Sequence, residues 1–368
     1  MANLRPFKPI KPGDLLQEEL DVRGWSQADL AAILQRPVQA INEIITGKKS
    51  ITVETALGLA TALGTSPEYW MNLESAYRLD LAAATQGALG GKEDPVARRA
   101  RLYHFAPVAE MLKRSWINVK NNKDLDEVEK GLCNFYQVDS LSMVHQPLCA
   151  ARKTQQDEEL TSAQRAWVHM VKVQSEARPF KPYSQKGLKK AAKLLVHQSV
   201  DEEHIRKIPD ILDELGVSLI FVEAFPRTKI DGIAFWHNEV PIIGLSLRLK
   251  RIDYFFFTLL HEIAHILNED AKEAELDLNI LDADEETERE KRANSDAREN
   301  LIPSDKLDLF LAKNPRLSKI AILSFAQTLK IHPAILVGRL HFEERLPYTH
   351  HRQMLGDVKQ TFDDLIIR

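Results

Sequence analysis

The chain has 368 residues, a formal net charge of −4 and 28% charged residues, which is typical of ordinary folded protein and predicts two or three domains. The charge excludes a globally basic nucleic-acid-binding protein, so any nucleic-acid contact must be local. No apolar run approaches a membrane span, no secretory signal is evident, and Cys133 and Cys149 lie in no metal or redox spacing, so we expect a cytoplasmic protein with no membrane contact.

Residues 1–84 predict a compact module of five short helices. The first opens at Pro12-Gly13 and ends at Gly24, and Ser26 with Asp29 forms the capping-box pattern that begins the second. Glycines or a Ser-Pro pair mark the limits of the remaining three helices. We expect these helices over 38–45, 52–63 and from 67 onward.

The second and third of these helices, joined by a tight turn, predict a helix-turn-helix. The second helix of that motif enters the DNA major groove, where Gln and Asn side chains pair with adenine while Lys and Arg contact phosphates. A helical bundle without a nucleic-acid role is the alternative. The residues expected to face DNA are Arg36, Gln39, Ala40, Asn42, Glu43, Lys48 and Lys49.

Motifs along this module carry a family resemblance. Gly47-Lys48-x-x-Ile51-Thr52 and Gly64-Thr65-Ser66-Pro67-Glu68-Tyr69-Trp70 resemble HigA-type antitoxins and other XRE-class repressors. The resemblance implies a homodimer on a palindromic operator, and in antitoxins of this type a toxin partner. Pro37-Val38 departs from the small polar residues usual there, which puts the base-reading set in doubt.

Residues 85–95 read as a linker, because they are rich in small and turn-forming residues. Residues 96–189 then predict a helical middle region, with helices over 107–116, 124–136 and 162–175. Its acidic runs are typical of solvated helix faces, and no catalytic pattern is found in it.

From residue 190 onward the pattern includes strands as well as helices. It predicts that residues 190–368 form a domain with helices and a small sheet. Helices are expected over 191–197 and 204–215 and strands over 217–223, 232–236 and 240–246, the last two as a hairpin. Pro241 predicts that the final strand lies at a sheet edge. Such an edge could bind a peptide by strand addition, although plain sheet packing explains the same residues.

The strongest chemical signal is His261-Glu262-x-x-His265, in an apolar stretch. Residues four apart share one helix face, so both imidazoles can bind one metal ion while Glu262 serves as a proton carrier. A helix with two solvated histidines is the alternative, and the apolar surroundings count against it.

A helix over about 285–301 follows an acidic stretch and can supply a third ligand. Glu290 heads a stripe of small residues, Ala293 and Ala297, that allows close helix approach. Glu290 is the favoured ligand, Glu286 lies one turn earlier on the same face, and Asp282 and Asp284 are weaker candidates.

This half of the chain also resembles a known family. The segments Lys229-Ile-Asp231-Gly232, His261-Glu262-x-Ala264-His265 and Glu290-x-x-Ala293-Asn294 are similar to the ImmA/IrrE metallo-endopeptidases. The resemblance implies a zincin-like domain in which His261, His265 and Glu290 bind Zn²⁺ and Glu262 is the general base. Residues expected to orient the site or contact substrate are Asp231, Gly232, Arg248 and Asp253; buried ion pairing is the equal alternative for the charged three. Candidate oxyanion donors are His332 and Tyr348, each more simply structural.

The sequence therefore predicts an α+β chain, mainly helical with a small sheet. The expected function is a cytoplasmic DNA-binding regulator whose zinc endopeptidase domain cleaves a repressor, another regulatory protein or itself in response to a signal. The alternative is an antitoxin-type repressor whose metal domain senses or stabilises with little turnover.

Overall fold

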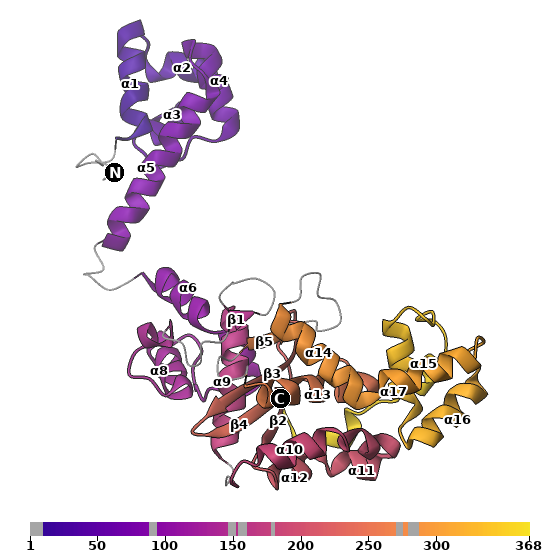
Figure 1. Ribbon diagram of the computed structural model, residues 1–368. Helices are drawn as coiled ribbons and strands as arrows, with labels where there is room; N and C mark the ends of the chain where they lie inside the picture. The colour runs from indigo at the N-terminus through magenta and orange to yellow at the C-terminus, as the bar shows by residue number, and fades with distance from the viewer. Residues whose placement is uncertain are drawn as a thin grey trace. The chain divides into compact units, whose positions relative to one another are not determined.

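The structure is a computed structural model that describes residues 10–87, 94–145, 152–153, 160–177, 181–269, 275–278 and 287–368. The chain divides into two compact units, Met1–Ala97 and Arg98–Arg368 (Figure 1). The predicted α+β class is confirmed, since strands occur only in the second unit among the described residues.

In the part of the first unit that the structure describes, the five predicted helices are present. They are α1 (Pro12–Arg23), α2 (Gln27–Ile33), α3 (Val38–Ile45), α4 (Val53–Leu63) and α5 (Pro67–Gly87). Gly24 ends α1 in the left-handed conformation, and Ser26 and Asp29 form the reciprocal capping box of α2. Leu20, Ile41 and Trp70 have no exposed surface at the centre of this bundle. The unit therefore has a hydrophobic core of its own.

The second unit is built around a six-stranded sheet in the order β1-β5-β3-β4-β2-β6. The strands are β1 (Arg152–Lys153), β2 (Ser218–Val222), β3 (Ile230–His237), β4 (Val240–Leu245), β5 (Glu275–Leu278) and β6 (Ile366–Ile367). The predicted hairpin is β3 with β4, antiparallel. β2 runs parallel to β4 and to β6.

The prediction that Pro241 marks a sheet edge is wrong, because β4 lies between β3 and β2. Pro241 is opposite Trp236 of β3, but the pairing with β2 begins only at Ile242. The proline, which has no N–H to donate, thus stands just outside the ladder that would need one. A peptide cannot be added to β4 as an edge strand.

Both faces of the central strands β2 and β4 are buried, which explains why these two strands are largely apolar rather than alternating. Leu219 and Phe221 of β2 face the core that contains α13 (Ile252–Leu267). Ile220 and Val222 face the opposite core, which contains Trp167 of α9 (Ser162–Glu176). The expected boundary at residue 190 therefore falls inside a unit, because a helix of the middle region covers one face of the sheet.

The remaining helices surround these layers. Before β2 in the chain lie α6 (Pro95–Phe105), α7 (Val108–Lys113), α8 (Leu125–Tyr136), α10 (Gln185–Ala192), α11 (Glu202–Arg206) and α12 (Ile208–Asp213). Between β5 and β6 lie α14 (Glu288–Leu301), α15 (Ser304–Lys313), α16 (Lys319–Leu329) and α17 (Pro333–Phe342). The helix expected over 204–215 is split, since Pro209 stands in the first turn of α12 and cannot continue a hydrogen-bond ladder from α11. The helix expected over 191–197 ends earlier, and His197 lies in the short 3₁₀ segment Leu195–Val200.

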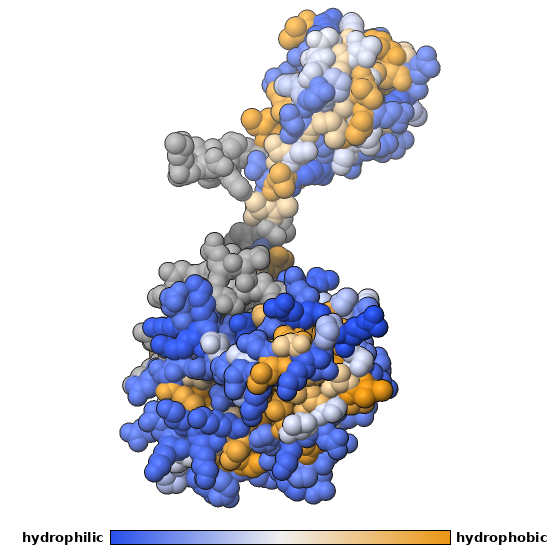
Figure 2. All heavy atoms as spheres, turned by 45° about the vertical axis from the view of Figure 1, so that its right-hand side comes forward, coloured by the Kyte–Doolittle hydropathy of each residue, from blue (hydrophilic) through white to orange (hydrophobic). Residues whose placement is uncertain are grey.

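No single described helix is long and apolar enough to cross a membrane. The face shown in Figure 2 is largely hydrophilic on the second unit, with apolar residues scattered among polar ones. Scattered apolar side chains of this kind are normal on protein surfaces.

Candidate metal centre and DNA-facing helix

The helix α13 carries the first two candidate ligands deep inside the second unit. It is buried from Ile252 to Ile266, because it packs against the strands β3 and β4 and the helices α10, α14 and α17. His261 has no exposed surface and His265 is 6% exposed. Their Nε2 atoms lie 3.0 Å apart, as the four-residue spacing on one helix face predicts.

The helix α14 brings Glu290 to the same point. Glu290 Oε2 lies 3.2 Å from His261 Nε2, and Glu290 Oε1 lies 3.3 Å from His265 Nε2. Ala293 and Ala297 are fully buried along the same stripe, and their small side chains allow α14 to approach α13. Burial raises the pKa of Glu290, but hydrogen bonds with the two histidines outweigh it and lower that pKa to about 2.

These distances fit one metal ion. Zinc–ligand bonds of about 2.0–2.1 Å in a tetrahedral site place ligand atoms roughly 3.3 Å apart. The separations of 3.0, 3.2 and 3.3 Å agree with that spacing, and one donor atom from each residue lies within 4.8 Å of the others. Two nitrogens and one carboxylate oxygen leave a fourth coordination position for another ligand.

Asn294 supports the first histidine and was not singled out from the sequence. Its Oδ1 lies 3.0 Å from His261 Nδ1, and its side chain is 2% exposed. With Nδ1 as the donor to this oxygen, Nε2 is the ring nitrogen of His261 that would bind a metal ion. The available signal was spacing, because Asn294 follows Glu290 by four residues and so shares its helix face.

Glu262 is fully buried next to the strand β3. A Cβ atom at position 232 would lie 2.1 Å from Glu262 Oε1 and 3.1 Å from Thr258 Cγ2. Gly232 is therefore required for the carboxylate to occupy this place, and the structure gives Gly232 a packing role beside Glu262.

Asp231, the neighbour of Gly232, anchors a buried polar cluster. Arg248 Nε donates to Asp231 Oδ1 over 2.9 Å, and Tyr254 OH donates to Asp231 Oδ2. Burial, and then the Asp231 charge, raises the pKa of Tyr254 above its ordinary value. Asp231 and Arg248 therefore form the buried ion pair that was the alternative to a role in the site. The hydrogen bond from Tyr254 to Asp231 also connects α13 with β3.

The helix α3 presents part of the expected DNA-facing set in the first unit. Ile41 and Ile44 are buried, while Gln39 and Asn42 are exposed on the opposite face. Gln39 Nε2 donates to Glu43 Oε1 over 3.1 Å, and Asn42 Nδ2 donates to Gln27 Oε1 over 3.2 Å. The helix thus offers an exposed amide-bearing face of the kind that reads base edges.

The other expected DNA contacts differ in accessibility. Lys48 and Lys49 are exposed just after α3, whereas Ala40 is half-buried. Arg36 donates to Thr55 Oγ1 over 2.8 Å and pairs with Glu54. Arg36 is therefore held on α4 and would have to leave these partners to reach a phosphate.

Comparisons with known proteins agree with this division into two units. A helix-turn-helix family model matches residues 16–70, and an "IrrE N-terminal-like domain" model matches residues 212–341. An uncharacterized HTH-type transcriptional regulator of Escherichia coli (strain K12), YddM, is 35% identical over 75 residues, which are 20% of this chain and 80% of the relative. The chain belongs to the HTH-type transcriptional regulators. Its second unit contains an IrrE-like domain over residues 212–341, so both resemblances seen in the sequence motifs are confirmed.

Other similar proteins match a short part of this regulator. Virulence-associated protein I of Dichelobacter nodosus is 39% identical over 82 residues, covering 22% of the regulator and 76% of the relative. A solved addiction module antidote protein of the HigA family from Coxiella burnetii is 41% identical, covers 22% of the regulator and 90% of that chain, and has a TM-score of 0.22. The antitoxin HigA of Pseudomonas aeruginosa, solved with the higBA promoter, is 33% identical, covers 24% and 98%, and has a TM-score of 0.22.

Three further residues that the sequence suggested for the site, Asp253, His332 and Tyr348, make contacts of their own. Asp253 begins α13, about 12 Å along the helix from His261 at 1.5 Å per residue, where it pairs with Arg251. His332 is the N-cap of α17, with Nδ1 accepting from the Ala334 N–H over 3.1 Å. Tyr348 is 57% exposed and stacks on His341. The structure thus gives His332 a capping contact and Tyr348 a stacking contact.

The sequence also suggested three other acidic residues as the third metal ligand. Glu286, Asp282 and Asp284 lie outside the described residues. Cys149 also lies outside them, whereas Cys133 is a half-buried free thiol.

Proposed function

We propose that this HTH regulator is also a zinc-dependent endopeptidase that acts in the cytoplasm on a regulatory protein. The proposal rests on one observation: the side chains of His261, His265 and Glu290 form a buried cluster, and the buried Glu262 is adjacent to His261 in the chain. A purely structural zinc site is usually closed by four protein ligands and would not need a buried glutamate at its side.

The three ligand side chains would hold the ion, and Asn294 would orient His261. When bound, zinc would act as a Lewis acid on a peptide carbonyl and lower the pKa of a water molecule. The ligand set of two histidines and one glutamate is one that catalytic zinc sites use.

Glu262 is the residue that we propose to move the proton. Its carboxylate would accept a proton from the attacking water and later donate it to the leaving amine. Gly232 of β3 leaves the space that this carboxylate occupies, so we expect its position to be set before a substrate arrives. A preorganised base of this kind avoids the cost of orienting it during the reaction.

The first unit would direct this activity to an operator. We propose that two copies bind palindromic DNA, with Gln39 and Asn42 of α3 at base edges and Lys48 and Lys49 at phosphates. Binding of this kind is steeply salt-dependent, since each phosphate contact releases counterions.

The metal assignment is tested by zinc content. We expect about one zinc per chain in the wild type, loss of zinc on His261→Ala and on Glu290→Ala, and retention on Glu286→Ala. Zinc lost with Glu286→Ala but kept with Glu290→Ala would move the third ligand.

The peptidase proposal is tested by comparing zinc-loaded wild type and Glu262→Gln. Each is expressed with the proteins encoded beside it and read by intact mass. Fragments formed by wild type and absent with Glu262→Gln are expected, and they name the substrate. Glu288→Gln is the matched control, because Glu288 is 90% exposed at the start of α14 and its loss should leave cleavage unchanged.

The same comparison decides on the rival function. If neither protein yields fragments under any inducing condition while both repress equally, the chain is an antitoxin-type repressor with a metal-stabilised second unit. A toxin encoded nearby would then co-purify equally with wild type and Glu262→Gln.

A further inference from the structure

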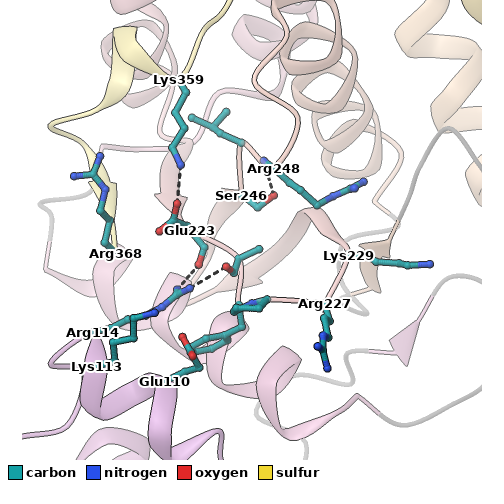
Figure 3. Close-up of a pocket in the computed structure, with 14 residues that line it drawn as sticks. Glu110, Lys113, Arg114, Glu223, Arg227, Lys229, Ser246, Arg248, Lys359 and Arg368 are labelled. Carbon is teal, nitrogen blue, oxygen red and sulfur yellow. Dashed lines mark hydrogen bonds and ion pairs between the residues drawn. The ribbon is translucent and has the colours of Figure 1, made fainter.

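A pocket that His261 and His265 do not line lies in the unit that contains the IrrE-like domain. It measures about 810 Å³ and opens where the parallel strands β2, β4 and β6 end (Figure 3). Glu223, Ser246 and Arg368, which directly follow these strands, line it. Ligands of open α/β sheets bind at this carboxyl edge, and pockets for small molecules measure roughly 300–1,000 Å³.

The lining of this pocket is strongly basic. Seven lysine and arginine side chains line it, against two glutamates, Glu110 and Glu223. Arg248 and Arg368 are already paired with Asp231 and Asp363, so the described side chains that line the pocket keep an excess of three positive charges. The whole chain has a net charge of −4, so this excess is a local feature.

The inner wall is fixed by hydrogen bonds within the pocket. Arg114 donates to the carbonyl oxygens of Glu223 and Ala224 over 2.6 and 2.9 Å. Lys359 Nζ donates to Glu223 Oε1 over 2.6 Å (Figure 3). One of the two carboxylates is therefore already occupied by a lysine and does not neutralise the remaining cations.

Three cations stand exposed on the rim. They are Lys113 at the end of α7, and Arg227 and Lys229 in the loop before β3. Within the described parts of the chain, no acidic side chain pairs with any of them. They are available for an anion that enters the pocket.

The backbone of the rim is strained. Arg227, Lys229 and Leu247 have φ angles of 67°, 54° and 49°. These angles lie in the left-handed region, where a residue with a side chain has a higher conformational energy than glycine. Such conformations concentrate at ligand clamps and active sites. The chain keeps basic side chains at two of these positions.

We propose that this pocket binds a small phosphorylated molecule. Charge-assisted hydrogen bonds from Arg and Lys are the usual means of holding phosphate oxygens, and a nucleotide-sized ligand fits the volume. Duplex DNA is the less suitable ligand, because its phosphates follow an extended ridge, whereas these cations surround a hollow whose wall carries two glutamates.

The pocket is connected to the proposed peptidase site through Asp231. Arg248 lines the pocket and pairs with Asp231, which precedes Gly232, against which Glu262 packs. A phosphate bound by Arg248 would compete with Asp231 for the guanidinium and shift β3 under Glu262. We infer that the ligand regulates cleavage, a consequence that rests on the proposed function.

Binding is measured by calorimetry on the full, zinc-loaded chain at constant ionic strength, with inorganic phosphate and adenosine monophosphate as probes and adenosine as the uncharged control. We expect both phosphates to bind and adenosine not to bind. The double variant Arg227→Gln with Lys229→Gln should weaken binding by about tenfold or more. The double variant Lys186→Gln with Lys189→Gln is the matched control, since it removes the same charge from exposed positions of α10.

The possible results distinguish phosphate binding in this pocket from binding elsewhere in the chain and from no binding. No heat with either phosphate, or equal weakening by both double variants, would overturn the proposal. Binding lost with Lys48→Gln and Lys49→Gln instead would assign the phosphate to the DNA-binding unit. A drop in duplex DNA affinity with Arg227→Gln and Lys229→Gln, without a change in phosphate affinity, would make the rim a DNA contact.

The regulatory consequence has a readout of its own. Cleavage of the substrate identified with Glu262→Gln is followed with and without adenosine monophosphate, and the rate should change in wild type but not in the rim variant. If phosphate binds and the cleavage rate is unaffected, the inferred regulation through Asp231 is wrong, but the proposed phosphate-binding site is still supported. If no cleavage occurs at all, the peptidase proposal fails and the calorimetry still decides the site.

Discussion

At the scale of single residues, the candidate metal centre depends on groups that bind no metal themselves. Asn294 fixes the orientation of His261 through a hydrogen bond of 3.0 Å. Gly232 leaves the space that the Glu262 carboxylate occupies. Neither residue has a reactive group, so each can be substituted to separate positioning from chemistry.

Asn294→Ala is expected to weaken zinc binding without abolishing it. Removing a hydrogen-bond partner of a ligating histidine typically costs about 10- to 100-fold in metal affinity, because the imidazole loses its fixed orientation. A competition titration with a zinc chelator measures the change. Asn268→Ala is the matched control, since Asn268 ends α13 and bonds only to Asp296 among the contacts seen; equal losses in both variants would contradict the role of Asn294.

Gly232→Ala is expected to keep zinc and lose cleavage. The added methyl group would lie 2.1 Å from Glu262 Oε1, so the carboxylate must move, and a misplacement of about 1 Å can cost roughly a hundredfold in rate. Zinc content and the rate of substrate cleavage are measured on the same sample. Gly58→Ala, which meets only the end of the Leu34 side chain, controls for the substitution. A full rate with Gly232→Ala would show that Glu262 does not act from this position.

At the scale of elements, α9 belongs to the sheet rather than to a separate spacer. Trp167 is fully buried among Val222, Phe235 and other sheet residues. Its indole Nε1 donates to the Val222 carbonyl oxygen over 2.9 Å. The helix therefore covers one face of the strands whose other face packs on α13.

Trp167→Ala should consequently destabilise the whole IrrE-like unit. Deleting a large buried aromatic side chain costs about 3–5 kcal/mol, and the lost hydrogen bond leaves a buried carbonyl without its donor. Denaturant unfolding followed by circular dichroism should show a lower midpoint for the transition of the sheet. The transition of the first unit, whose core is separate, serves as the internal control; an unchanged sheet transition would make α9 an independent spacer.

Local signals in the sequence predict the elements, and long-range packing decides what they do. The caps at Ser26 and Gly24 and the spacing of His261 and His265 act within a few residues, so the first unit and the metal helix were predictable. The place of Pro241 depends on where β2 stops pairing, and the role of Gly232 depends on a side chain thirty positions away. Such relations between distant segments leave no periodic trace in the sequence.

Asp231 shows the same limit for charged residues. Its acidity and its motif are visible in the sequence, but its pairing with Arg248 and Tyr254 is a property of the fold. The cationic pocket was likewise not expected, because its basic residues come from five separated segments and none of them forms a charge run.

At the scale of the whole molecule, the two units have separate hydrophobic cores and separate candidate sites. Sites without shared contacts usually respond independently to substitution. DNA binding and metal chemistry should therefore be separable by single variants in the full chain.

We expect Gln39→Ala with Asn42→Ala to weaken operator binding by at least about tenfold, because each good base-reading pair contributes about 1–3 kcal/mol of discrimination. The same double variant should keep its zinc and its cleavage rate. His261→Ala should show the reverse, with loss of zinc and cleavage but unchanged operator affinity at a fixed salt concentration. These quantities are measured on one set of proteins by fluorescence anisotropy, zinc analysis and intact mass. If His261→Ala also loses the operator, metal binding controls DNA binding, and the regulator is a metal sensor as well as a candidate peptidase.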